Sequence, residues 1–263
     1  MKKVYLFISF FNLLLLSACS TSKTVVSSNY LPGAVPKTIS LTAKDGLKIT
    51  ADLYSISDKK APYIILFHHS HSSRGEYIQI APRFNELGFN CLVVDYRLGS
   101  VYPPMNGIIN QTAVEFEKAG KLLSPYLSSY LPDLEAALLY TKDKLKANKI
   151  FIMGSSLSAS LVFVLGSEFK EDVSGIFSFS VDRLDGRVNI EGLTVMDCSK
   201  NITCPVFIGA EAKNDSYAKA IYENIPSSTK AYCEIDSMGA AALSTSPSAF
   251  SVWEEVINFI NRL

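Results

Sequence analysis

The residues best suited to chemistry stand near the middle of the chain, in the segment GSSLS at residues 154–158. Its central residue, Ser156, has small residues two positions away on either side, Gly154 and Ser158, in a close variant of the G-x-S-x-G nucleophile elbow. Small neighbours are needed because a sharp turn from strand to helix brings the two backbones close together. A serine presented on such a turn can act as a nucleophile once a base accepts its proton. The alternative interpretation is an ordinary Gly-Ser turn in a β–α unit.

The flanking sequence predicts the strand and the helix that such a turn requires. Residues 150–153 form a short apolar run rich in strand formers, and residues 157–166 suit a buried helix. Other predicted strands lie at residues 37–43, 47–54, 63–67, 91–95, 174–180, 205–210 and 231–236. Strands that alternate with helices predict an α/β fold with a mostly parallel central sheet of about eight strands and helices on both faces.

Local signals add detail to this α/β pattern. Asp45-Gly46 predicts a hairpin between the first two strands. Ser73 and Glu76 have capping-box spacing, which predicts a helix from near residue 74 to about residue 87. Residues 97–132 form a long mixed segment, either a surface excursion or an insertion that covers a pocket. Further helices are predicted at residues 112–123, 134–145, 216–224 and from 248 to the end.

Composition limits the possible functions. The chain has 263 residues, of which 48% are hydrophobic and 19% charged, as in a globular protein with one large domain. Lysine plus arginine and aspartate plus glutamate number 25 each, and no basic run occurs, so nucleic acid is not predicted as a partner. All three histidines lie at residues 68–71, away from the cysteines, so we predict neither a metal site nor a cofactor.

The first residues predict a targeting segment. Lys2 and Lys3 precede an apolar stretch over residues 4–16, and Leu-Ser-Ala-Cys at residues 16–19 resembles a bacterial lipobox, which implies lipid attachment at Cys19. The alternatives are an ordinary signal peptide and a single membrane helix. We therefore expect a lipoprotein signal peptide at residues 1–18, a flexible tether at 19–36, a folded domain at 37–263, and a location in the bacterial cell envelope, anchored to the membrane.

Four other cysteines would share that oxidising compartment. Cys91 and Cys233 lie in predicted buried strands, where a thiol is usually a small apolar group. Cys198 and Cys204 flank a short stretch and could close a loop, so they form the candidate disulfide.

Four motifs together resemble α/β-hydrolases of the esterase and dienelactone-hydrolase-like group. They are LFHHSHSSRGEY at residues 66–77, CLVVDYR at 91–97, LPDLEAAL at 131–138 and GSSLSAS at 154–160. The resemblance covers about residues 37–263 and implies an ester-like small-molecule ligand. It also implies that Ser156 is the nucleophile and that the backbone N–H groups of Leu157 and His69 form the oxyanion hole. Asp215, with Glu211 as runner-up, would be the acid.

The chain departs from this family at the catalytic histidine. The position expected for histidine, beyond the last strand, holds Met238 before Gly239, and methionine cannot accept a proton from serine. His68 is expected to shape the loop after the third strand, while His71 or His69 remains an alternative base. Three hypotheses follow. They are a weak or atypical serine esterase, a catalytically dead pseudo-hydrolase that binds a ligand or partner, and a structural envelope lipoprotein.

Overall fold

The computed structural model describes residues 35–263 apart from 59, 123, 182–187, 189–191 and 213–214. The predicted signal peptide, Cys19 and all but the last two residues of the predicted tether lie outside the described residues. Within the described part of the chain, no helix combines the length and apolar character needed to cross a membrane.

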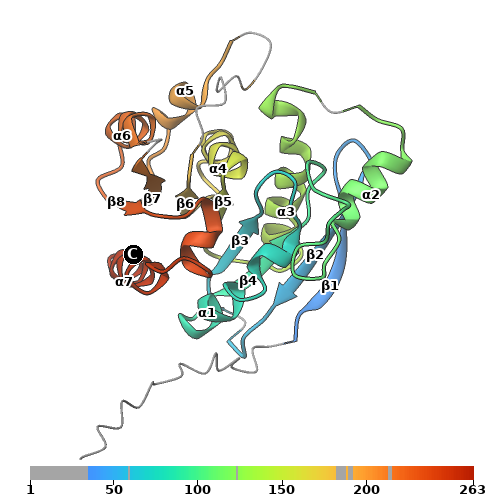
Figure 1. Ribbon diagram of the computed structural model, residues 1–263, viewed down its shortest axis with the longest axis horizontal. Helices are drawn as coiled ribbons and strands as arrows, with labels where there is room; N and C mark the ends of the chain where they lie inside the picture. The colour runs from blue at the N-terminus through green and yellow to red at the C-terminus, as the bar shows by residue number, and fades with distance from the viewer. Residues whose placement is uncertain (1–34, 59, 123, 182–187, 189–191, 213–214) are drawn as a thin grey trace, which may run out of the picture. The chain divides into compact units, whose positions relative to one another are not determined.

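An eight-stranded sheet forms the centre of the domain (Figure 1). The strands are β1 (Lys37–Thr42), β2 (Lys48–Tyr54), β3 (Tyr63–Phe67), β4 (Asn90–Val94), β5 (Ile150–Ser155), β6 (Gly175–Phe179), β7 (Val206–Glu211) and β8 (Lys230–Ile235). Their spatial order is β1-β2-β4-β3-β5-β6-β7-β8. Only the β1–β2 and β2–β4 pairs are antiparallel, and the other five are parallel. The predicted mostly parallel sheet of about eight strands is confirmed.

Helices cover both faces of this sheet. They are α1 (Ala81–Glu86), α2 (Gln111–Lys118), α3 (Leu131–Asp143), α4 (Leu157–Glu168), α5 (Val195–Ser199), α6 (Asp215–Asn224) and α7 (Ala249–Ile260). Side chains of α3, α4, α5 and α6 share one buried core, and those of α1 and α7 share the other. Strand residues alternate between the two cores, so that Ile65 and Phe67 face the first while Ile64 and Leu66 face the second. This two-sided burial explains why the central strands read as continuous apolar runs.

The segment after β3 differs from its prediction. Instead of one helix from residue 74 to about 87, a short 3₁₀ helix, η1 (Arg74–Tyr77), precedes α1. Pro82 lies in the first turn of α1, where its missing N–H costs no helical hydrogen bond, and this explains why the helix restarts there. Ser73 caps η1 by accepting a hydrogen bond from the N–H of Gly75 at 3.1 Å. Glu76 does not complete the predicted capping box, because its carboxylate is bound elsewhere.

A buried ion-pair network joins the end of β4 to α3 and to the first hairpin. The guanidinium of Arg97 donates to both carboxylate oxygens of Asp133, at 2.6 and 3.0 Å, and the Arg97 N–H donates to the same group at 2.7 Å. The Nη1 and Nη2 atoms of the same guanidinium also donate to Asp45, at 2.8 and 3.2 Å, so that Nη2 is shared between the two carboxylates. Burial acts to raise the pKa of Asp45, but the hydrogen bonds and charge of Arg97, together with the hydrogen bonds from the Leu47 N–H and Lys121, lower that pKa to about 2.

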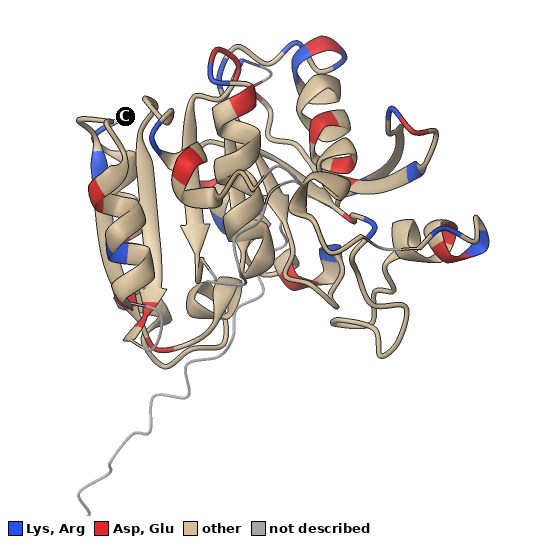
Figure 2. Cartoon of the chain, turned by 90° about the horizontal axis from the view of Figure 1, so that it is seen from above, with Lys and Arg blue, Asp and Glu red and all other residues tan. Residues whose placement is uncertain are grey.

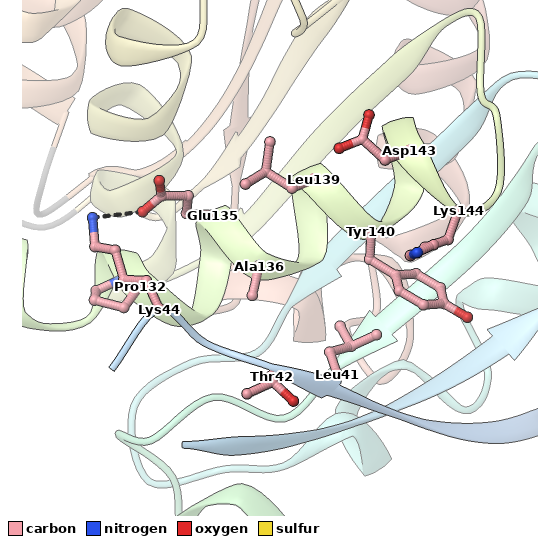
Figure 3. A pocket seen from close by; sticks show the side chains of 10 residues that line it. All are labelled: Leu41, Thr42, Lys44, Pro132, Glu135, Ala136, Leu139, Tyr140, Asp143 and Lys144. Atoms are coloured by element: carbon pink, nitrogen blue, oxygen red, sulfur yellow. Dashed lines mark ion pairs between the residues drawn. The ribbon is translucent and has the colours of Figure 1, made fainter. Parts of the chain in front are cut away.

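Basic and acidic residues are interspersed along the helices and loops, as the blue and red segments of the backbone in Figure 2 show. A hollow of about 380 Å³ lies between β1 and α3, with charged and apolar side chains around it (Figure 3). It is lined by Leu41, Thr42, Lys44, Pro132, Glu135, Ala136, Leu139, Tyr140, Asp143 and Lys144. None of these residues belongs to the serine segment or to the loops that contact it, so this hollow is separate from the candidate site.

Candidate active site

Ser156 forms the sharp turn between β5 and α4. Its backbone has φ 55° and ψ −115°, a conformation that residues other than glycine rarely adopt. Its N–H donates to the Phe179 carbonyl at 2.8 Å. Gly154 is required by packing, because a Cβ built there would lie 2.0 Å from the carbonyl oxygen of Ser158. The close approach of strand and helix backbones that the sequence motif implies is therefore present.

Three serines of this turn differ in accessibility. Ser155 and Ser158 are fully buried, whereas 9% of the surface of Ser156 is exposed to solvent. Ser158, which replaces the second glycine of the motif, donates its hydroxyl to the His68 carbonyl at 2.6 Å. Its extra polar atom is thereby satisfied. Of these three residues, Ser156 keeps the most exposed surface.

His68 is a structural residue of the loop after β3. Its Nε2 accepts hydrogen bonds from the Tyr96 N–H at 3.3 Å and from the Asn110 amide at 3.0 Å. The proton is therefore assigned to Nδ1, which donates to the His69 carbonyl at 2.7 Å. Burial lowers the pKa of His68 to about 3. With both ring nitrogens bound and the ring neutral, this imidazole shapes the loop and cannot serve Ser156 as a base.

The predicted oxyanion-hole donors lie in different situations. Leu157 is the first residue of α4, where backbone N–H groups have no partner within the helix. The N–H of His69, in contrast, donates to the carboxylate of Glu76 at 2.8 Å. The neighbouring N–H of Ser70 has no hydrogen-bond partner among the described residues. Among the described residues, the N–H of Leu157 thus has no acceptor, whereas that of His69 has one.

His71, the alternative base, lies at an exposed turn. Its φ of 62° is in the left-handed region, and no hydrogen bond joins its side chain to Ser156 in the described part of the chain. His69 is half-buried, and its Nδ1 contacts the Ser70 carbonyl. The structure does not bring either imidazole into contact with the serine.

The loop after β8 meets the serine turn at Gly239. The Gly239 N–H donates to the Ser180 hydroxyl at 2.7 Å, and the Ala240 N–H donates to the Ser155 hydroxyl at 2.9 Å. A Cβ built on Gly239 would lie 2.1 Å from the Ser155 Oγ and 3.5 Å from the Ser156 nitrogen. Met238, the residue before this contact, has 47% of its surface exposed. Residue 238 therefore directly precedes the backbone that packs against the serine turn.

The two candidate acids follow the same strand. Glu211 is the last residue of β7 and is partly buried. Asp215 is the first residue of α6, but its side chain and the two residues before it lie outside the described part of the structure. The choice between these acids therefore remains a prediction. Among the described residues, no cluster of three or more histidine, cysteine, aspartate or glutamate side chains could hold a metal ion.

The predicted Cys198–Cys204 disulfide is absent from this structure, in which both residues are free thiols. Cys198 lies in α5, a helix that the sequence analysis did not predict, and its side chain packs into the core near Ser167 of α4. Cys204 is half-buried in the segment before β7. Burial raises the pKa of both thiols, that of Cys204 to about 11. Local sequence spacing did not reveal that α5 buries one partner.

Glu76 is the site residue that sequence reasoning missed. One carboxylate oxygen accepts from the His69 N–H at 2.8 Å, and the other accepts from the Ser155 hydroxyl at 2.7 Å. Burial raises the pKa of Glu76, although His69 and the hydrogen bonds act in the opposite direction. Its spacing from Ser73 indicated a helix cap, and no local pattern could indicate a partner 79 residues away.

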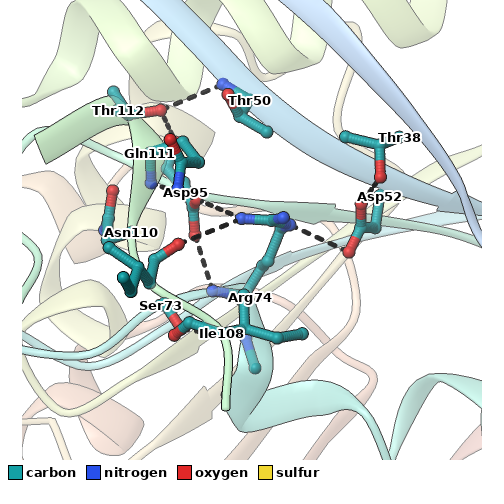
Figure 4. Close-up of polar contacts among 12 residues, drawn as sticks. Thr38, Thr50, Asp52, Ser73, Arg74, Asp95, Ile108, Asn110, Gln111 and Thr112 are labelled. Atoms are coloured by element: carbon teal, nitrogen blue, oxygen red, sulfur yellow. Dashed lines mark hydrogen bonds and ion pairs between the residues drawn. The ribbon is translucent and has the colours of Figure 1, made fainter. Parts of the chain in front are cut away.

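Arg74 holds the short helix that carries Glu76 (Figure 4). Its guanidinium pairs with Asp52 at 2.9 Å and with Asp95 at 2.6 Å, and its backbone N–H donates to Asp95 at 2.7 Å. The N–H of Gln111 adds a hydrogen bond to Asp95 at 2.9 Å. Burial raises the pKa of Asp95, and the charge of Arg74 opposes that shift. These contacts fix η1 to β2, to the residue after β4 and to the start of α2.

Comparison with known proteins identifies the fold. Neither a protein-family model nor a curated protein sequence matches the chain. Among solved structures, the esterase Pf2001 of Pyrococcus furiosus has a TM-score of 0.64 at 17% identity, over 87% of this chain and 93% of that one. A dienelactone hydrolase from Anabaena variabilis has a TM-score of 0.60 at 12% identity, over 87% and 97%. Est1E from Butyrivibrio proteoclasticus has a TM-score of 0.59 at 16% identity, over 86% and 98%. The chain therefore has the α/β-hydrolase fold.

Proposed function

We propose that this protein is an esterase-like serine hydrolase of weak or atypical activity, in which Ser156 is the nucleophile and Met238 stands in the place of the catalytic histidine. The observation that carries this proposal is the strained backbone of Ser156, with the loop that follows Met238 packed against its turn. A serine in this conformation, beside the open N–H of Leu157, can attack a carbonyl whose oxygen needs stabilisation. The ligand is proposed to be a small ester-like molecule.

The second candidate is a pseudo-hydrolase that binds a ligand or partner without turnover. Met238 favours it, because a thioether cannot act as a general base and the described imidazoles make no contact with Ser156. Labelling with a fluorophosphonate probe separates the two candidates, since the probe reacts only with a nucleophilic serine.

We expect slow, stoichiometric labelling of the wild-type protein at Ser156, detected by mass spectrometry of the modified peptide. Ser156→Ala should abolish it. Ser167→Ala, which removes a half-buried serine elsewhere on α4, is the matched control and should label as the wild type does. A folded wild-type protein that stays unlabelled at long exposure would contradict the hydrolase and leave the ligand-binding candidate.

We also propose attachment to the cell-envelope membrane through a lipid on Cys19, on the basis of its lipobox-like sequence. Metabolic labelling of the full chain with an alkyne fatty acid should mark the wild type and Cys204→Ser equally. Cys19→Ser should lose the label and appear in the soluble fraction. Label that persists in Cys19→Ser would show that the lipid is attached elsewhere.

A further inference from the structure

One carboxylate, that of Glu76, links three segments of the candidate site, two by direct hydrogen bonds and the third through Ser155. Glu76 accepts the His69 N–H of the loop after β3 and the Ser155 hydroxyl at the end of β5, at 2.8 and 2.7 Å. Ser155 in turn accepts the Ala240 N–H of the loop after β8 at 2.9 Å. Glu76 is thus connected to the loop after β3 and to Ser155, the residue before the candidate nucleophile. Through Ser155 it is also connected to the loop of Met238.

We infer that Glu76 is a positioning residue of the candidate active site, which holds these three segments in register around Ser156. This inference rests on the proposed function, because the register matters only where Ser156 reacts. Glu76 is not needed to begin η1, since the Ser73 hydroxyl caps that helix and Arg74 anchors it to Asp52 and Asp95. Its carboxylate is directed instead at the serine turn.

The contacts require an ionised carboxylate in particular. A carboxylate is only an acceptor, so it can receive one hydrogen bond at each oxygen. Glutamine has nearly the same shape, but its amide nitrogen is a donor and would meet either the His69 N–H or the Ser155 hydroxyl. The backbone N–H cannot reverse its direction, so Glu76→Gln must lose or rearrange one contact. Hydrogen bonds to a charged group contribute more to the free energy of folding than hydrogen bonds between neutral groups do.

Protonation should mimic this substitution. The titratable groups that face Glu76 are the His69 imidazole and the hydroxyls of Tyr77 and Tyr96, and the serine turn and the Ala240 segment add none. Burial raises the pKa of Glu76, so the carboxylate gains its proton at a higher pH than an exposed glutamate does. The acid form offers one acceptor fewer, and the register should loosen as pH falls through that pKa.

The test follows the wild-type protein and Glu76→Gln by two readouts. The first is the NMR shift of two amide protons, which requires no activity. The His69 amide reports the carboxylate directly, and the Ala240 amide reports it through the Ser155 hydroxyl. In the wild type the chemical shift of the His69 amide proton should change with pH as the Glu76 carboxylate gains its proton. In Glu76→Gln that change should be absent, and both amides should exchange with solvent faster. Glu86→Gln, which removes an exposed carboxylate from nearby α1, is the matched control and should behave as the wild type.

The second readout is the rate of fluorophosphonate labelling at Ser156. Glu76→Gln should reduce it about ten- to a hundredfold, as expected for one lost charge-assisted hydrogen bond. The ratio of wild-type to variant rates should shrink at acidic pH. Unchanged amide shifts together with an unchanged labelling rate would overturn the inference. If Glu76→Gln does not fold, the pH dependence of the wild-type His69 amide shift alone decides, and a pH-independent shift would contradict the inference. A wild-type protein that is never labelled but shows the pH-dependent His69 amide shift would reject the proposed function. The role of Glu76 in holding the three segments together would still stand.

Discussion

Met238→His should raise the hydrolysis of p-nitrophenyl acetate by at least about a hundredfold over the wild type, since a general base contributes about a hundredfold to ten-thousandfold. Residue 238 precedes Gly239, which packs against the serine turn, so an imidazole there would stand beside Ser156. The wild type, which lacks this base, should hydrolyse the ester slowly through its oxyanion site alone. The gain should increase with pH through the pKa of the new imidazole, near 6.5 when unperturbed, because only neutral imidazole accepts a proton.

Two variants control this measurement. Met238→Leu keeps an apolar side chain of similar volume and should match the wild type, while Met238→His combined with Ser156→Ala should lose the whole gain. A folded Met238→His protein without increased activity would mean that the histidine position is wrongly assigned or that neither Asp215 nor Glu211 acts as the acid. Fast wild-type turnover that disappears in His71→Ala would show that a loop histidine already acts as the base.

Arg97→Met should lower the free energy of unfolding by about 3–5 kcal/mol, the usual effect of leaving a buried charge without its partner. Asp133 has no exposed surface, and Arg97 supplies three of its hydrogen bonds, two from the guanidinium and one from the backbone. Burial raises the pKa of Asp133 and Arg97 opposes that shift, so the substitution should raise it further. The variant's stability should therefore fall as pH rises from about 4, the pKa of an unfolded aspartate, towards the raised folded value.

Urea denaturation at pH 5 and pH 8 measures both the loss and its pH dependence. Lys118→Met, which breaks the exposed pair between Lys118 and Glu115, is the control and should cost less than about 1 kcal/mol. Adding Asp133→Leu to Arg97→Met should recover much of the lost stability. An Arg97→Met loss as small as that of the control would show that Asp133 finds another partner or becomes neutral without cost.

Much of the fold could be predicted because its signals are local. Apolar runs bounded by turn residues located the strands, and Asp45-Gly46 correctly indicated the first hairpin. The continuous helix from residue 74 failed because the 3₁₀ turn and the restart near Pro82 depend on packing that the motif does not encode. The position of α5, which buries Cys198, was missed for the same reason.

The candidate site divides along the same line. Gly154 and Ser156 were recognised because the strand-to-helix turn needs particular residues at adjacent positions. Glu76 was interpreted as a helix cap because its real partners, Ser155 and the His69 N–H, are selected by tertiary structure. A motif reports the conformation of its own segment. It says little about which distant segment will supply the other half of a hydrogen bond.

The backbone of Ser156 carries an evolutionary implication. A residue other than glycine at φ 55° and ψ −115° costs on the order of 1–3 kcal/mol, whereas glycine reaches positive φ without steric penalty. If stability were the only selective pressure, a single change to glycine would be favoured at this position in every lineage that had lost the chemistry. Persistence of the hydroxyl in descendants of this gene would therefore record selection for a reactive or binding role, and its replacement by glycine would date the loss of that role.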